Sequence, residues 1–274
     1  MNLEDHAGDV VRKARLMMDV PAAEAAAGGG IPLDALSAFE QSGVAPTGID
    51  WDGIARRLDL SGPKLRQLAG GWLPAAIDLG GWRELRVIST EGDGMTVNAF
   101  LVWDEVTRDA ALFDTGFDAT PIFHLIEAER LTLQHLFITH THGDHVAAMG
   151  PIRERFPKVR LHTQAKSAPP QHRNRANDFI HVGSLRVSNR ETPGHAEDGV
   201  TYIVGGFPED APSVAVVGDA IFAGSIGGAP GRGVPTRRAI REQILTLPGP
   251  TLICPGHGPL TTVEEQKRAN PFFD

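Results

Sequence analysis

Apolar residues recur at helical spacing in short blocks before residue 80. Residues three or four positions apart lie on one face of a helix, so each block predicts a short amphipathic helix. The blocks are Val10, Val11 and Ala14; Leu33, Leu36 and Phe39; Ile54, Leu58 and Leu60; and Leu65 and Leu68. The sequence therefore predicts an all-α helical module of four or five short helices over residues 1–80, with an Ala/Gly-rich stretch at 22–30.

After Trp82 the pattern becomes typical of strands. The runs LRVIST, TVNAFLVW and AALF are separated by turns that contain Gly and Asp. Later strand-like runs, HLFI, TYIV, SVAVV and TLIC, are separated by helical stretches. Hairpins followed by strand–helix alternation predict a layered α/β domain over residues 81–274.

Composition narrows the class of protein. With 41% hydrophobic and 22% charged residues among 274, the chain has the composition of an ordinary folded domain. Its acidic N-terminus lacks the pattern of a secretory signal, and no apolar run approaches the roughly 20 residues of a membrane span. One cysteine, Cys254, excludes an internal disulfide. We therefore expect a cytoplasmic protein without membrane contact, and the net charge of −8 argues against general affinity for nucleic acid.

The segment THTHGDHV, residues 139–146, directly follows the apolar run HLFI. It offers His140, His142, Asp144 and His145, and imidazole with carboxylate is a donor set for divalent transition metals. Neighbouring side chains on such a turn diverge, so these residues do not suit one tetrahedral ion. Two adjacent ions resolve this, with His140 and His142 facing one and Asp144 and His145 facing the other.

Three further residues supply the missing partners. His195 lies in TPGH, Asp219 in VAVVGDA and His257 in ICPGHG, each at a predicted strand end or in a Gly/Pro turn. The intervals between them are long enough for a strand or strand–helix unit to return to the same sheet edge. If Asp219 bridges the ions, the seven residues complete a dinuclear site.

In order and spacing, HxHxDH, TPGH, GD and PGHG resemble the metallo-β-lactamase superfamily over residues 82–274. The resemblance implies a four-layer αββα sandwich, and it implies that Asp114, in LFDTG, orients a ligand without being one. Within the superfamily, GDAIFAGSIG and LICPGHGPLTTVEEQKRANPFF resemble the short members of the glyoxalase II group, which are related to hydroxyacylglutathione hydrolases. The chain departs from that group at Ala220 and Gly228, and its tyrosine and lysine positions that hold glutathione have no recognisable counterpart.

The resemblance implies a dinuclear hydrolase of thioesters or related small acyl compounds. A hydroxide shared by two ions would attack the carbonyl, with Asp144 and Asp219 as the carboxylates of the reaction centre. The ion on His140, His142 and His195 would polarise the carbonyl, while the ion on Asp144, His145 and His257 would hold the leaving group. Zinc is the first expectation, and iron or manganese suits the same donors.

Two other functions fit parts of the sequence. A mononuclear iron site with His140, His142, His195 and Asp219 would resemble the superfamily's persulfide dioxygenases. Residues 8–75 faintly resemble the helix-turn-helix domain of Cro-type repressors, which would make the chain a DNA-binding ligand sensor. Residues 1–80 hold 7 Lys and Arg against 11 Asp and Glu, and such a balance disfavours DNA. The alternative uses of the module are packing, homodimer formation or covering the active site.

The remaining histidines have no partners at ligand spacing, and we interpret them as surface or packing residues. They are His6, His124, His135, His162, His172 and His181. The segment PPQHRNRAND is interpreted as a solvated loop, with a second use in which Arg173 or Arg175 meets an anionic substrate group. Cys254, in an apolar strand, is interpreted as a buried packing residue.

Overall fold

Five α-helices precede the first strand in the computed structural model, which describes residues 2–175, 178–208 and 211–274. They are α1 (Ala7–Met17), α2 (Ala22–Gly28), α3 (Leu33–Ser42), α4 (Trp51–Leu58) and α5 (Gly62–Ala69). Four of them coincide with the predicted apolar blocks. The fifth, α2, forms from the Ala/Gly-rich stretch, where alanine's high helix propensity replaces a long apolar repeat.

The first sheet consists of β1 (Leu85–Gly92), β2 (Met95–Trp103), β3 (Asp109–Phe113), β4 (Thr132–Phe137) and β5 (Arg160–His162), in that order. The first three strands are antiparallel, whereas β3, β4 and β5 are parallel. Asp93 and Gly94 form the two-residue turn between β1 and β2, both with positive φ, as a tight hairpin requires. Helices α6 (Thr120–Ala128), α7 (Gly143–Val146) and α8 (Met149–Arg155) lie between the later strands.

The second sheet has the order β13 (Thr261–Thr262), β12 (Leu252–Pro255), β9 (Val214–Gly218), β8 (Val200–Gly205), β7 (Leu185–Glu191) and β6 (Ile180–Val182). Strands β6 to β9 form an antiparallel meander, and β9 and β12 are parallel. The expected strand–helix alternation is therefore wrong for this stretch. A strand buried on both faces reads as a continuous apolar run whichever way its neighbours point, so the pattern did not reveal direction.

After β9 the chain forms the hairpin of β10 (Ile221–Phe222) and β11 (Ser225–Ile226), then α9 (Gly233–Gln243). Helix α10 (Val263–Ala269) follows β13, and two 3₁₀ turns are η1 (Leu79–Gly81) and η2 (Pro170–His172). None of the helices in the described ranges has the length and apolar character needed to span a membrane.

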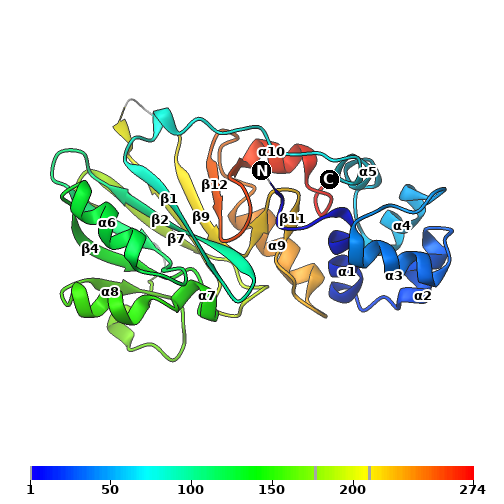
Figure 1. Cartoon of the computed structure of the whole chain (residues 1–274), viewed down its shortest axis with the longest axis horizontal. Coiled ribbons are helices and arrows are strands. Elements are labelled where there is room, and N and C mark those ends of the chain that lie inside the picture. Colours follow the sequence, from blue (N-terminus) through cyan, green and yellow to red (C-terminus); the bar gives the residue numbers. More distant parts are fainter. Residues whose placement is uncertain (1, 176–177, 209–210) are drawn as a thin grey trace.

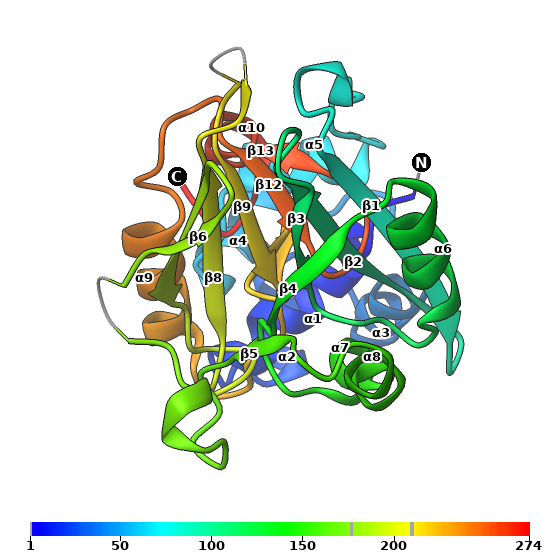
Figure 2. The ribbon, with the colours of Figure 1, turned by 90° about the vertical axis from the view of Figure 1, so that its left-hand side faces the viewer.

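The two sheets face each other, with helices on their outer sides (Figure 2). In β2, Phe100 and Val102 point into the core between the sheets, whereas Ala99 and Leu101 pack under α6 and α8. Such alternation is the period-two pattern of a strand buried on both faces. On the far side, α9 and α10 cover the second sheet. The predicted four-layer αββα sandwich with N-terminal helices is confirmed.

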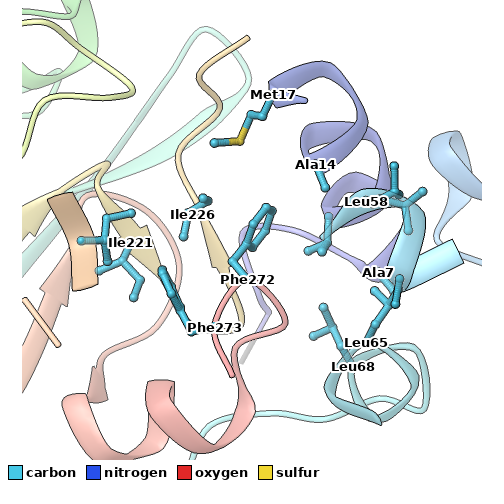
Figure 3. Packing of buried hydrophobic residues seen from close by; sticks show 14 of the residues in the cluster. Ala7, Ala14, Met17, Leu58, Leu65, Leu68, Ile221, Ile226, Phe272 and Phe273 are labelled. Atoms are coloured by element: carbon cyan, nitrogen blue, oxygen red, sulfur yellow. The ribbon is translucent and has the colours of Figure 1, made fainter. Parts of the chain in front are cut away.

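The helical module packs onto the outer side of the second sheet, at the right of Figure 1. Figure 3 shows Leu58, Leu65 and Leu68 facing Phe272 and Phe273 across this junction, beside β10 and β11. The junction also carries charge, because the fully buried guanidinium of Arg237, on α9, lies 3.0 Å from the carboxylate of Asp59. The module thus shares one hydrophobic core with the sandwich.

Candidate metal centre

Strand direction brings the predicted donors to one edge of the sandwich. Parallel strands end at the same edge of a sheet, and β3 and β4 are parallel in the first sheet, as β9 and β12 are in the second. Asp114 directly follows β3, and His140 lies three residues beyond β4. Asp219 directly follows β9, and His257 lies two residues beyond β12. The loops after these strands therefore meet at one place between the two sheets.

The seven predicted side chains form three overlapping groups. In each group, one donor atom from every residue lies within 4.8 Å of the others. The groups are His140, His142 and His195; His140, His145 and Asp219; and Asp144, His145 and His257. His140 belongs to the first two groups and His145 to the last two, so the three groups form one continuous cluster of donors.

Asp219 lies between the groups. Its Oδ1 is 3.3 Å from His145 Nε2, and its Oδ2 is 3.5 Å from both His195 Nε2 and His257 Nε2. At one end of the cluster, His257 Nε2 is 3.1 Å from Asp144 Oδ2. The Asp219 carboxylate thus lies close to imidazoles from all three groups.

Three buried polar atoms of the cluster have no hydrogen-bond partner: His140 Nε2, His145 Nε2 and Asp219 Oδ1. A buried polar group without a partner costs about 1–3 kcal/mol, so such atoms call for an explanation. A cation would satisfy all three, because each is a lone-pair donor that faces the others. The residues present therefore fit a metal centre.

Hydrogen bonds fix the orientation of the imidazoles. His145 Nδ1 donates to Asp114 Oδ2 at 2.8 Å, His195 Nδ1 to the Gly228 carbonyl at 3.1 Å, and His257 Nδ1 to the Thr96 carbonyl at 2.6 Å. With the proton held on Nδ1, the lone pair of each Nε2 faces the centre.

Asp114 is itself held firmly. Its carboxylate accepts hydrogen bonds from the backbone N–H of Thr139, at 2.8 Å, and from the Thr139 hydroxyl, at 2.7 Å. The residue is almost fully buried and adopts a positive φ of 56°. Asp114 therefore contacts a predicted ligand, His145, and lies outside the three donor groups.

Burial and charge oppose each other in the cluster. Burial lowers the pKa of His140 to about 2. Burial also acts against protonation of His145, but Asp114 and Asp219 outweigh it and raise that pKa to about 10. Although burial disfavours its charged form, Asp219 has a pKa well below the usual range, because the adjacent imidazoles of His145 and His257 stabilise the carboxylate. Without a cation the centre retains protons, so metal binding would release them.

Close backbone approach shapes the same centre. A Cβ on Gly256 would lie 2.3 Å from Asp219 Oδ1, and a Cβ on Gly227 would lie 2.8 Å from His195 Cβ. Both distances are shorter than van der Waals contact allows. Glycine at these two positions is therefore required by the donors beside it.

The other histidines lie away from the centre. His135 Nδ1 is 2.9 Å from His162 Nε2, and both rings stack on Phe137; burial lowers their pKa values to about 4 and about 3. His6 caps α1. His124 and His181 are exposed, and His172 ends η2.

In the described part of the chain, Arg173 and Cys254 belong to none of the three donor groups. Arg173 donates to the carbonyls of Ala168 and Lys166 within its own loop, and Arg175 is exposed; residues 176–177 of that segment lie outside the described residues. Cys254 is buried between the sheets, as interpreted, and burial raises the pKa of its thiol.

Several groups at the centre were not singled out from the sequence. Thr139 directly precedes the HxHxDH segment and could have been found there. The carbonyls of Thr96 and Gly228 had no signal, because every residue carries one. Lys13 of α1 also reaches this region, donating to the Ile226 carbonyl at 3.2 Å. A helical pattern alone does not separate such a lysine from a solvated one.

The geometry agrees with comparisons to known proteins. The family described as the metallo-beta-lactamase superfamily matches residues 92–257. A probable metallo-hydrolase of Bacillus subtilis, YqgX, is 29% identical, with 70% of this chain and 97% of that protein covered. The hydroxyacylglutathione hydrolase GloC of Haemophilus influenzae is 28% identical, over 65% of this chain and 92% of its own. The human mitochondrial persulfide dioxygenase ETHE1 is 29% identical, over 63% of this chain and 69% of its own.

Solved structures give the same picture. The B3 metallo-beta-lactamase BLEG-1 superposes with a TM-score of 0.58 at 27% identity, covering 69% of this chain and 98% of that one. TTHA1623, solved in a di-iron-bound form, has a TM-score of 0.52 at 27% identity, covering 68% of this chain and 100% of that one. These shorter chains are almost completely covered, and the family match starts at residue 92. The helical module therefore lies outside the part of the chain that is similar to these proteins.

Proposed function

We propose that this chain hydrolyses thioesters or related small acyl compounds with two divalent ions. The chain belongs to the metallo-β-lactamase superfamily of metallohydrolases. The observation that carries this proposal is the set of three overlapping donor groups with buried, unpartnered donor atoms. We assign one ion to the group that contains His142 and His195 and the other to the group that contains Asp144 and His257, with Asp219 between them. Residues 81–274 would form the catalytic domain and residues 1–80 the helical module.

The side chains of this chain would hold and orient the reactants. When bound, two divalent ions polarise a carbonyl and lower the pKa of a shared water toward about 7. Asp144 and Asp219 are the two carboxylates of the donor set, and we propose that they hold the water and accept hydrogen bonds from it. Asp114 keeps the His145 ring in position through its hydrogen bond to Nδ1.

Similarity supports the substrate class and leaves more than one metal open to test. Thioesters are proposed because of the 28% identity to the hydroxyacylglutathione hydrolase GloC. Zinc is our first assignment, since imidazole and carboxylate donors suit it. The similarity to TTHA1623 in its di-iron-bound form supports iron as the alternative, and manganese suits the same donors.

A second candidate is a mononuclear iron persulfide dioxygenase, favoured by the 29% identity to ETHE1. That reaction would need the donors of one ion. The group of Asp144, His145 and His257 would then have no cation to bind, although its donor atoms lie within 4.8 Å of one another. We therefore place the dioxygenase second.

Reading of DNA by the helical module is not proposed. Helix α3 buries Leu36 and Phe39 in the module, and Glu40 accepts two hydrogen bonds from the guanidinium of Arg15. The described residues that line the shallow hollow on its outer side include Asp34 and Gln41 and no cation. A DNA-reading surface normally offers Arg, Asn or Gln together with basic side chains for phosphates.

Elemental analysis of the purified protein, together with an assay of a lactoylglutathione-type thioester, tests the proposal. We expect about two equivalents of zinc, iron or manganese per chain and thioester hydrolysis that a chelator abolishes. One equivalent of iron without thioester hydrolysis would replace the proposal by the dioxygenase. The variant His124→Gln, in an exposed helix position, is the control and should match the wild type.

A further inference from the structure

A cleft of about 700 Å³ lies beside His257. Its walls come from residues 2–4, Ile77, the β1–β2 hairpin and residues 258–260. The N-terminal segment that leads into α1 is thus one wall, and the family match, which starts at residue 92, does not include it.

The cleft adjoins the candidate metal centre. The Thr96 carbonyl, in the cleft wall, accepts the hydrogen bond from His257 Nδ1, and Gly258 continues the chain from His257. Glu4 packs against the same turn, because a Cβ on Gly258 would lie 3.3 Å from Glu4 Cβ. The cleft therefore adjoins His257 on the side of the ring that carries Nδ1.

The lining is mainly apolar. Apolar surface comes from Leu3, Ile77, Met95, Pro259 and Leu260. Met95 is 46% exposed, and its unbranched side chain can adapt to different shapes of ligand.

The polar side chain of Asn98 is already engaged. Its Nδ2 donates to the carbonyls of Pro255, at 3.2 Å, and Gly258, at 3.0 Å. Its Oδ1 accepts from the Ser89 hydroxyl at 2.7 Å. Asn98 therefore has little hydrogen-bonding capacity left for a ligand.

Charge in the cleft is negative. Among the described residues that line it, Glu4 is the single charged side chain. The α1 lysine whose charge acts on Glu4, Lys13, is 2.5 Å from the Asp5 carboxylate and also donates to the Ile226 carbonyl. An anionic arm in the cleft would meet Glu4, and no lysine or arginine is among the described residues that line the cleft.

We propose that this cleft binds the leaving-group arm of the substrate and selects an apolar, uncharged or cationic thiol over an anionic one such as glutathione. This inference rests on the proposed thioester hydrolysis. The N-terminal segment of the helical module then determines specificity, because Glu4 supplies the charge that excludes anions and Leu3 supplies apolar surface.

Two non-hydrolysable thioethers test the inference by binding. S-octyl-N-acetylcysteamine and S-octylglutathione share the octyl chain; the other arm is short and neutral in the first and a net-anionic tripeptide in the second. By calorimetry with the metal-loaded protein, we expect the neutral probe to bind about 10-fold more tightly. Glu4→Gln should reduce this ratio to about 2-fold or less, because it removes the charge and keeps the shape. Met95→Ala should weaken the neutral probe several-fold.

Matched variants provide the controls. Glu105→Gln and Val106→Ala change exposed side chains in the β2–β3 turn and should leave both affinities unchanged. Equal binding of the probes, or a ratio unaffected by Glu4→Gln, would overturn the inference. Hydrolysis of octanoyl-N-acetylcysteamine is measured separately. If the protein hydrolyses this thioester but binds the two probes equally, the cleft assignment alone is overturned. If it prefers the neutral probe but does not hydrolyse the thioester, the proposed hydrolysis is overturned.

Discussion

Two buried aspartates lie at opposite ends of the sandwich and have very different surroundings. Asp219 is 8% exposed at the candidate metal centre, and Asp104 is 4% exposed in the turn after β2. Since β2 and β3 are antiparallel, Asp104 lies at the far end of the sheet from Asp114. Both carboxylates are buried in a protein whose stability is only about 5–15 kcal/mol, so each must be compensated.

Asp104 is compensated by N–H and O–H donors. It accepts from Val106 N, at 3.0 Å, and Thr107 N, at 2.6 Å, which closes the β2–β3 turn. It also accepts from the N–H and hydroxyl of Ser184, at 2.8 and 2.5 Å, in the turn between β6 and β7 of the other sheet. Asp219 instead faces three imidazoles, and its Oδ1 has no hydrogen-bond partner. The first arrangement is complete in the protein alone, whereas the second needs a cation.

Asp219→Ala should have the largest effect. We expect the metal content to fall from about two equivalents to at most one, with thioester hydrolysis lost, because the proposed bridge is removed. Elemental analysis measures the content directly, and Asp104→Asn serves as the matched buried-aspartate control. Two equivalents retained in Asp219→Ala would contradict the assignment of this residue.

Metal removal tests the same difference between Asp219 and Asp104 through the thermal stability of the protein. Free metal at about 100 times its Kd stabilises a protein by about 2.7 kcal/mol, so a chelator should lower the Tm of the wild type. Asp104→Asn should lose a similar amount on chelation, and Asp219→Ala much less. An equal response of Asp219→Ala and the wild type in differential scanning calorimetry would mean that the stabilising ion binds elsewhere.

Asp114→Ala should weaken metal affinity about 10–100-fold while the seven proposed ligands remain. The physical reason is that His145 Nδ1 would lose its acceptor and the ring its fixed orientation. Competition with a chromophoric chelator gives the affinity. A change no larger than that of Asp118→Ala, an exposed carboxylate four residues away, would remove Asp114 from this role.

Asp104→Asn should have the smallest effect, on stability alone, of about 1–2 kcal/mol at neutral pH. Despite burial, hydrogen bonds from Ser184 and Thr107 lower the pKa of Asp104 below its usual value near 3.8. Its contribution to stability is therefore present above about pH 4 and is lost as pH falls through the folded pKa. Urea unfolding should show the gap between variant and wild type closing below pH 4. Glu105→Gln is the control, and a gap that is constant from pH 7 to pH 2 would contradict this origin.

The local pattern of apolar residues predicted many of the helices and strands. Runs of apolar residues predicted β2, β3 and β9, and apolar residues at helical spacing predicted four of the five N-terminal helices. Direction in the second sheet was not predictable, since a strand buried on both faces has the same pattern in parallel and antiparallel pairing. Helix α2 was missed because short alanine-rich helices have little apolar periodicity.

The sequence by itself determined which chemistry this chain can offer: four donors concentrated in residues 140–145 and three more at later strand ends. Only the tertiary structure decided which donors share a position, that Thr96 and Gly228 carbonyls orient two imidazoles, and that residues 2–4 form a wall of the neighbouring cleft. The physical reason is that residue type and spacing are local properties. Contacts between segments distant along the chain depend on strand order and on the core that joins the helical module to the second sheet.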